Sequence, residues 1–309
     1  MSAADGNKLA VEIAGIKMKT PVMTASGTCG YGLELLDFVD LNSLGALVVK
    51  GATLEPCPGN AGQRIAETPA GALNAIGLEN PGVGVFIDNI LPALRRYDVP
   101  VIANIAGRTV DEYAELARRL DATAVAGIEI NISCPNIKAG GLAFGTRPGS
   151  AAEVVGAVRR ASGKPIITKL SPNVTDIAEI ARAAEAAGSD ALSLINTLVG
   201  MKIDIKRKQP ALGNIFGGLS GPAVRPVAVR MVWQAARAVK IPVIGMGGIA
   251  AAEDALEFIM AGASAVAVGS ATFADPQSIE LITQGLRAYM REEAAANIGE
   301  LVGAAWPPA

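Results

Sequence analysis

The feature that most constrains the fold is a set of short apolar runs in which polar and apolar residues do not alternate. Three of these runs, 101–104, 166–169 and 243–246, each follow a proline directly. Uninterrupted apolar runs of this length are typical of strands that are buried on both faces of a parallel sheet. Counted along the whole chain, eight segments are expected as strands: 22–25, 46–49, 101–104, 128–132, 166–169, 192–195, 243–246 and 266–269.

Helix-like segments lie between these runs and carry recognisable end signals. Thr109-x-x-Glu112 and Ser150-x-x-Glu153 both have the spacing of a capping box at a helix start. Glycines are expected just after three helix ends, at Gly163, Gly188 and Gly262. Eight strands with intervening helices predict an α/β fold, the (β/α)₈ TIM barrel.

The domain organisation follows from the same pattern. No linker divides the chain, so one barrel domain is expected over residues 1–309. Before the first barrel strand, 9–13 and 16–18 flank Ala14-Gly15, which predicts a β-hairpin at the bottom of the barrel.

Composition excludes several classes of protein. Lysine plus arginine total 27 against 29 acidic residues, so nothing favours nucleic acid or a membrane surface as partner. The polar start and the lack of a run of about 18 apolar residues argue against a signal peptide and a membrane span, and a cytoplasmic protein is expected. Three scattered cysteines without C-x-x-C predict no metal site and no iron–sulfur cluster held by this chain alone.

The segment Asn131-Ile-Ser-Cys-Pro-Asn136 stands where the fourth predicted strand stops. The chain has no histidine, so a general base must come from another residue type, and Cys134 between two asparagines is the candidate. The alternative is a small buried residue before a turn. The segment 138–145 that follows, with its glycines, is expected to act as a lid. Cys29 is expected to pack in the core and Cys57 to lie in a loop.

The ends of the predicted strands carry amides, lysines, hydroxyls and glycines. In a barrel the carboxyl ends of the strands meet at one mouth, where the active site lies. The glycines after the last two strands predict a phosphate site, because backbone N–H groups can approach an anion there; the alternative is a pair of tight turns. The residues at these ends are Ser26, Gly27, Lys50, Gly51, Asn104, Asn131, Lys169, Asn196, Thr197, Gly247, Gly248, Gly269 and Ser270.

The two lysines and the asparagines suggest what the mouth binds. Lys50 and Lys169 each end an apolar strand, so each is expected either to meet a ligand anion or to form a structural ion pair. The segment Asn74–Asn80 is expected as a loop that brings further amides to the mouth. Carboxamides offer donors and an acceptor together, which suits a flat ligand edged with C=O and N–H groups, such as a pyrimidine.

These motifs together resemble those of the dihydroorotate dehydrogenases. The resemblance runs over essentially the whole chain and matches in order. A cysteine at position 134 resembles the soluble class 1 branch of the family, which carries cysteine as the base. The run from Asn74 to Pro81 resembles that of the NAD-linked class 1B catalytic subunit. The matching motifs are Asn-Ala-Ile-Gly-Leu at 74–78, Asn-Ile-Ser-Cys-Pro-Asn at 131–136, Lys-Leu-Ser-Pro-Asn at 169–173, Ile-Asn-Thr at 195–197, Gly-Gly-Leu-Ser-Gly-Pro at 217–222 and Gly-Met-Gly-Gly-Ile at 245–249.

The resemblance implies one FMN per chain and the oxidation of dihydroorotate to orotate in pyrimidine biosynthesis, with Cys134 as the base. The positions that match flavin contacts are Ser26, Lys50, Gly51, Asn104, Asn131, Lys169, Ile195, Gly221, Gly247, Gly248, Gly269 and Ser270. The positions that match substrate contacts are Lys50, Asn74, Ala75, Ile76, Gly77, Leu78, Asn131, Asn136, Asn196 and Thr197.

The resemblance also implies a homodimer joined by two partner subunits that carry FAD and a [2Fe–2S] cluster and pass electrons to NAD. Four alternatives stay open from the residues: a fumarate-linked dihydroorotate dehydrogenase, another FMN barrel that reduces a pyrimidine or a tRNA uridine, a catalytically silent barrel subunit, and a barrel aldolase with a Schiff base on Lys169.

Overall fold

The computed structural model describes residues 7–132 and 144–308, and its centre is an eight-stranded parallel sheet in the order β3-β16-β15-β10-β9-β8-β7-β4. The two end strands meet, because Thr24 N donates to Ala46 O over 3.3 Å and Val48 N donates to Thr24 Oγ1 over 2.8 Å. The predicted (β/α)₈ barrel is therefore confirmed, and every predicted strand is present within one residue at each end. The strands are β3 (Val22–Thr24), β4 (Leu47–Val48), β7 (Val101–Ile105), β8 (Gly127–Asn131), β9 (Ile166–Lys169), β10 (Ala191–Leu194), β15 (Val243–Met246) and β16 (Ala265–Val268).

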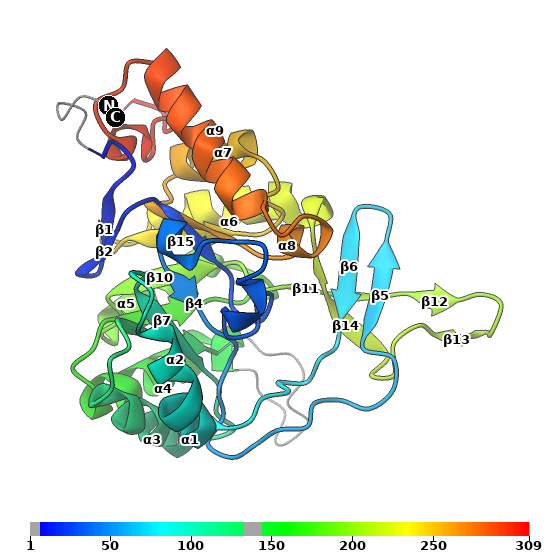
Figure 1. Cartoon of the computed structure of the whole chain (residues 1–309). Helices are drawn as coiled ribbons and strands as arrows, with labels where there is room; N and C mark the ends of the chain where they lie inside the picture. Colours follow the sequence, from blue (N-terminus) through cyan, green and yellow to red (C-terminus); the bar gives the residue numbers. More distant parts are fainter. Residues whose placement is uncertain (1–6, 133–143, 309) are drawn as a thin grey trace.

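Helices cover the outside of this sheet (Figure 1). The long ones are α3 (Val110–Asp121), α4 (Pro148–Ala161), α5 (Ile177–Ala186), α6 (Arg225–Ala236), α7 (Ala252–Met260) and α9 (Ser278–Glu292). The short ones are α1 (Val83–Val85), α2 (Leu91–Leu94), α8 (Ala271–Ala274), a π-turn η3 (Phe86–Ile90), and 3₁₀ turns η1 (Leu33–Leu35), η2 (Leu41–Ser43), η4 (Phe144–Thr146), η5 (Pro222–Val224) and η6 (Ile298–Leu301). Within the described residues, no helix combines the length and apolar character needed to cross a bilayer.

The predicted helix ends are confirmed in part. Thr109 caps α3, and its hydroxyl accepts from Glu112 N over 3.2 Å. Gly188 and Gly262 follow α5 and α7 with φ of 103° and 120°, the left-handed region that glycine tolerates best. The capping box predicted at Ser150 is wrong, because α4 already begins at Pro148. Proline is favoured at the first helical position, because the N–H that it lacks would have no partner within the helix.

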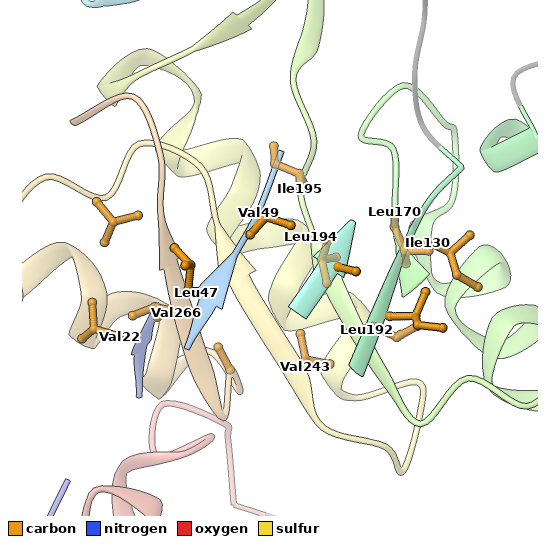
Figure 2. Close-up of a cluster of buried hydrophobic side chains, with 14 of the residues drawn as sticks. Val22, Leu47, Val49, Ile130, Leu170, Leu192, Leu194, Ile195, Val243 and Val266 are labelled. Atoms are coloured by element: carbon orange, nitrogen blue, oxygen red, sulfur yellow. The ribbon is translucent and has the colours of Figure 1, made fainter. Parts of the chain in front are cut away.

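Two apolar layers hold the barrel together. Figure 2 shows part of the outer layer, where strand residues such as Val22, Leu192 and Val266 belong to one buried cluster with helix residues. The inner layer fills the barrel and includes Ile13 and Ile16 from the hairpin of β1 (Val11–Ile13) and β2 (Ile16–Met18). Because a Cβ on Gly127, the first residue of β8, would meet Ile16 Cδ1 at 2.9 Å, the hairpin closes the amino-terminal end of the barrel, as predicted.

A second, antiparallel sheet stands beside the mouth of the barrel, and the sequence did not predict it. Its order is β11-β14-β6-β5, so strands from two distant parts of the chain pair. The prediction that Asn74 begins a loop is wrong, because Asn74 is the last residue of β6. In Figure 1 a small hairpin, β12 with β13, projects beyond this sheet. The bounds are β5 (Ile65–Thr68), β6 (Gly71–Asn74), β11 (Leu198–Met201), β12 (Ile203–Asp204), β13 (Gln209–Pro210) and β14 (Phe216–Ser220).

Candidate active site

A cavity lies between the carboxyl ends of the barrel strands and the antiparallel sheet. It brings together most of the residues that the sequence singled out. Of the predicted positions that the structure describes, two do not line it: Ala75 is buried in a small cluster with Leu73 and Leu212, and Gly221 packs behind Gly248. The predicted residues that line the cavity are Ser26, Lys50, Gly51, Asn74, Ile76, Gly77, Leu78, Asn104, Asn131, Lys169, Ile195, Asn196, Thr197, Gly247, Gly248, Gly269 and Ser270.

Lys169, at the end of β9, is a buried cation with a neutral partner. Its side chain is only 4% exposed, and Nζ donates to Ser26 Oγ over 3.0 Å. Neither Lys169 nor Lys50 has a carboxylate oxygen within 4.0 Å among the described residues, so the structural ion pair that was the alternative is not found there. A buried cation in this state favours an anionic group in the cavity.

Asn104, on β7, presents a hydrogen-bond acceptor to the cavity. Its Nδ2 donates to Glu129 Oε2 over 2.6 Å, while its Oδ1 is buried and has no partner among the described residues. Glu129 in turn accepts from Ser193 Oγ over 2.7 Å. Glu129 and Ser193 were not predicted as site residues. The one available signal was an acidic residue inside the apolar run 127–130.

Asn131 and Asn196 lie side by side at the ends of β8 and β10. Asn196 Nδ2 donates to Asn131 Oδ1 over 3.3 Å, and Asn196 Oδ1 accepts from Thr197 N over 2.8 Å. The backbone of Asn131 is held from outside the barrel, because its carbonyl accepts from Tyr113 OH over 2.7 Å. Two carboxamides are thus fixed at neighbouring points of the cavity, as the sequence predicted.

The antiparallel sheet forms the other side of the cavity and depends on glycine. Asn74 Nδ2 donates to Gly218 O over 3.2 Å, which ties β6 to β14 at the cavity. A Cβ on Gly218 would lie 1.9 Å from Thr197 Oγ1, so only glycine leaves Thr197 in place. Residues of this sheet that the sequence did not assign to the site also line the cavity: Ile65, Ala72, Gly218, Leu219 and Ser220.

The predicted phosphate loops also line the cavity, with Gly247, Gly248, Gly269 and Ser270. Gly247 and Gly248 have φ of 129° and 81°, which side chains rarely adopt. The loop that follows is fixed by Asp254, whose Oδ2 accepts from Ala250 N over 2.8 Å and Ala251 N over 3.0 Å. Both glycines line the cavity, but a positive φ is also what the alternative, a pair of tight turns, requires, so the phosphate site stays a prediction.

The cysteines differ in what the structure says of them. Cys134 and Asn136 lie outside the described residues, as does most of the predicted lid, 138–143. Cys29 is buried, as predicted, and burial raises the pKa of its thiol to about 11. Cys57 is half-buried in the loop before β5, as predicted, and its thiol donates to Gly77 O over 3.3 Å. Phe144, predicted as part of the lid, packs edge-on against Tyr113.

Comparison with known proteins gives consistent matches. Residues 8–290 match the family model described as dihydroorotate dehydrogenase. Over 299 residues the chain is 60% identical to the dihydroorotate dehydrogenase B (NAD⁺) catalytic subunit of Desulforudis audaxviator, covering 96% of this chain and 97% of that protein. The proteins of the same name from Trichlorobacter lovleyi and Geotalea uraniireducens are 58% and 57% identical over 297 residues, covering 96% of this chain and 98% and 97% of theirs.

Proposed function

The chain belongs to the dihydroorotate dehydrogenase family, and from that premise we propose which of its residues carry the reaction. The protein is an FMN-dependent oxidoreductase that converts dihydroorotate to orotate in pyrimidine biosynthesis, and it is of the NAD-linked type. The fumarate-linked alternative is not favoured, because each relative named above is an NAD⁺ enzyme. What remains to propose is the role of each side chain.

The cavity fits a flavin on its chemistry. Its barrel side offers a buried cation at Lys169 and, at Asn104 Oδ1, a buried acceptor without a partner in the described residues, and glycines whose backbone N–H groups suit an anion also line it. A flavin mononucleotide carries a ring with N–H and C=O groups and a phosphate, which are complementary to these features. We assign the ring to Lys169, Asn104 and Asn131, and the phosphate to the loops at Gly247–Gly248 and Gly269–Ser270.

Substrate binding is assigned to the residues between the barrel and the antiparallel sheet. Lys50 pairs with the substrate carboxylate, and the carboxamides of Asn74, Asn131 and Asn196 hold the carbonyl and N–H groups of its ring. Ala75, which is buried away from the cavity, contributes only to the backbone of this segment. Asn136 completes the set by its position in the motif.

In the proposed chemistry one C–H bond loses its proton and the neighbouring C–H bond loses hydride, so that a ring C=C bond forms. The thiolate of Cys134 takes the proton. When bound, FMN accepts the hydride. Lys169 is held by Ser26 beside the place assigned to the flavin ring, and its buried ammonium would stabilise the negative charge that the ring gains on reduction. The single observation that carries this proposal is the convergence of Lys169, Asn104 and Asn131 on one cavity, in a chain 60% identical to an enzyme of this name.

A separate electron-transfer subunit follows from the words "catalytic subunit" in the names of the relatives. We propose that this partner carries FAD and a [2Fe–2S] cluster, since three scattered cysteines cannot supply the four thiolates that such a cluster usually takes. Two chains of this protein and two partners would then form a heterotetramer in the cytoplasm. Copurification with a flavin–iron–sulfur protein, followed by an assay of NAD⁺ reduction, tests this assembly.

The test of the base is Cys134→Ala. The purified variant is expected to keep FMN and its yellow colour, but dihydroorotate should bleach the flavin about 10²–10⁴-fold more slowly without oxygen, since general bases contribute that much. In the unaltered protein the bleaching rate should rise with pH as the thiol ionises. Cys57→Ala is the matched control and should bleach at the normal rate. Normal bleaching in Cys134→Ala would remove Cys134 from the role, and a colourless protein that never binds FMN would overturn the assignment of the cavity.

A further inference from the structure

Glu129 is a buried carboxylate that the proposed chemistry does not use. It sits in the middle of β8, and its side chain is 2% exposed. Its two oxygens accept from side chains of two other strands: Oε2 from Asn104 Nδ2 on β7 over 2.6 Å, and Oε1 from Ser193 Oγ on β10 over 2.7 Å. The three side chains form one hydrogen-bonded chain across the inside of the barrel, and one end of this chain reaches the cavity.

Among the described residues, this carboxyl group has no ion-pair partner. Within residues 7–132 and 144–308, no lysine or arginine nitrogen lies within 4.0 Å of it, so two neutral donors are its only partners there. Burying an acidic group with so little compensation opposes folding, and an apolar residue of similar size would pack at less cost. Its presence therefore points to a role other than stability.

The hydrogen bond from Asn104 fixes which end of the Asn104 amide faces the cavity. Oε2 of Glu129 accepts from Nδ2 of Asn104, so the NH₂ group of Asn104 is turned towards Glu129. The amide oxygen then turns the other way, where it is buried and without a partner in the described part of the chain. Gly51 keeps that oxygen accessible, because a Cβ at this position would lie 2.7 Å from it.

We propose that Glu129 is a positioning residue: by holding Asn104 through its amide nitrogen, it presents the amide oxygen to the cavity and so selects a ligand with an N–H donor at that point. This rests on the proposed function, under which the donor is the single N–H of the oxidised flavin ring. Without an acceptor at position 129, the Asn104 amide can turn over and offer its NH₂ group, which repels the same N–H.

The test compares FMN with 3-methyl-FMN, in which a methyl group replaces that N–H. Both are titrated into the full-length chain freed of FMN, and their dissociation constants are measured by flavin fluorescence. The ratio compared is the dissociation constant of 3-methyl-FMN divided by that of FMN. Glu129→Met, which removes the acceptor at nearly constant size, should lower the ratio about tenfold, because only FMN has a hydrogen bond to lose. Glu129→Gln keeps an acceptor oxygen, so the ratio should stay within about threefold of the unaltered protein.

Ser193→Ala is the matched control. It removes the other hydrogen bond to Glu129 but leaves the contact with Asn104, so the ratio should be retained. A ratio unchanged in Glu129→Met overturns the proposal, and so does an equal fall in the Met and Gln variants, which would point to the charge alone. If Glu129→Met does not fold, Asn104→Ala decides: it removes the oxygen itself and must lower the ratio to a similar extent. A chain that binds neither flavin would refute the proposed function, whereas tight FMN binding with an unchanged ratio in these variants would refute only this inference.

Discussion

The two sides of the cavity are built by different kinds of sheet and differ sharply in burial. On the barrel side, Lys169, Asn104 and Asn131 are 4%, 1% and 9% exposed. On the side of the antiparallel sheet, Ile65, which lines the cavity, is 49% exposed. Strands of a barrel are covered on both faces, whereas an antiparallel sheet can leave one face to solvent.

This difference in burial indicates that the two sides of the cavity have different roles. Polar groups that are deeply buried are costly unless they are paired or meet a ligand, so those of the barrel side are placed for chemistry and for a tightly held cofactor. The antiparallel sheet holds fewer buried groups and is joined to the barrel at the glycines of β14. We therefore expect changes on the barrel side to affect the chemical step, and changes in the antiparallel sheet to affect mainly the binding of substrate.

The largest effect is expected from Lys169→Met on the barrel side. It removes the buried cation that Ser26 holds, while keeping much of the side-chain volume. Loss of one preorganised charge should slow the anaerobic reduction of the flavin by dihydroorotate about 10²–10³-fold, measured by stopped-flow absorbance. Lys206→Met, an exposed lysine in the turn between β12 and β13, is the control and should react normally. Reduction within fivefold of normal in Lys169→Met, or a matching loss in the control, would contradict the division proposed here.

A smaller effect of a different kind is expected from Gly218→Ala in the antiparallel sheet. The new Cβ would lie 1.9 Å from Thr197 Oγ1 and 2.6 Å from Thr197 Cβ, so Thr197 must move. Overpacking of this kind typically costs about 1–3 kcal/mol, so the KM for dihydroorotate should rise roughly tenfold with FMN retained.

The control for Gly218→Ala is Gly200→Ala on the neighbouring strand β11. Its Cβ would lie 3.0 Å from the flexible end of Leu73 and 3.8 Å from Leu219 Cβ, an ordinary contact, so steady-state kinetics with an artificial electron acceptor should be nearly normal. If Gly218→Ala instead lowered the rate of flavin reduction at saturating substrate, with no change in KM, the antiparallel sheet would share in the chemical step.

The same comparison explains what the sequence could predict. The barrel strands are apolar without alternation, because a strand of a parallel sheet is buried on both faces. The polar residues at their ends, Lys169, Asn104 and Asn131, could therefore be predicted as site residues. Strand β14 reads Phe-Gly-Gly-Leu-Ser, and glycine has low strand propensity, so no local pattern marks it. Its pairing of Gly218 with Asn74 joins residues 144 positions apart, which no window along the chain contains.

Glu129 shows a second limit of sequence reasoning. It was visible as one acidic residue in an apolar run, but its partners Asn104 and Ser193 lie on two other strands. Only the register of the barrel decides which side chains inside it meet. The residue types at the strand ends could therefore be predicted, and the contacts that orient them could not.

The last effect lies outside the reaction itself and concerns the two described cysteines, Cys29 in the barrel core and Cys57 in the loop before the antiparallel sheet. Cys29 is 3% exposed against the barrel, and its thiol donates to Val48 O over 3.6 Å. Burial raises the pKa of this thiol to about 11, so it stays protonated and unreactive at pH 8. Cys57 is only half-buried, in the loop that leads to the antiparallel sheet.

With iodoacetamide at pH 8, we expect the peptide of Cys57 to be labelled at least tenfold faster than that of Cys29, as followed by mass spectrometry, with Cys134 tracked as its own peptide. As the pH rises towards 11, labelling of Cys29 should begin, because its folded thiol then starts to lose its proton. Because the pKa of this thiol is raised from 9.0 to about 11 in the folded chain, the unfolded chain gives up the proton at lower pH. The free energy of unfolding should therefore fall as the pH rises from 9.0 to about 11. Equal labelling of both cysteines at pH 8 would show that the barrel core opens as readily as the loop, and the contrast in burial between the barrel and the region of the antiparallel sheet would fail.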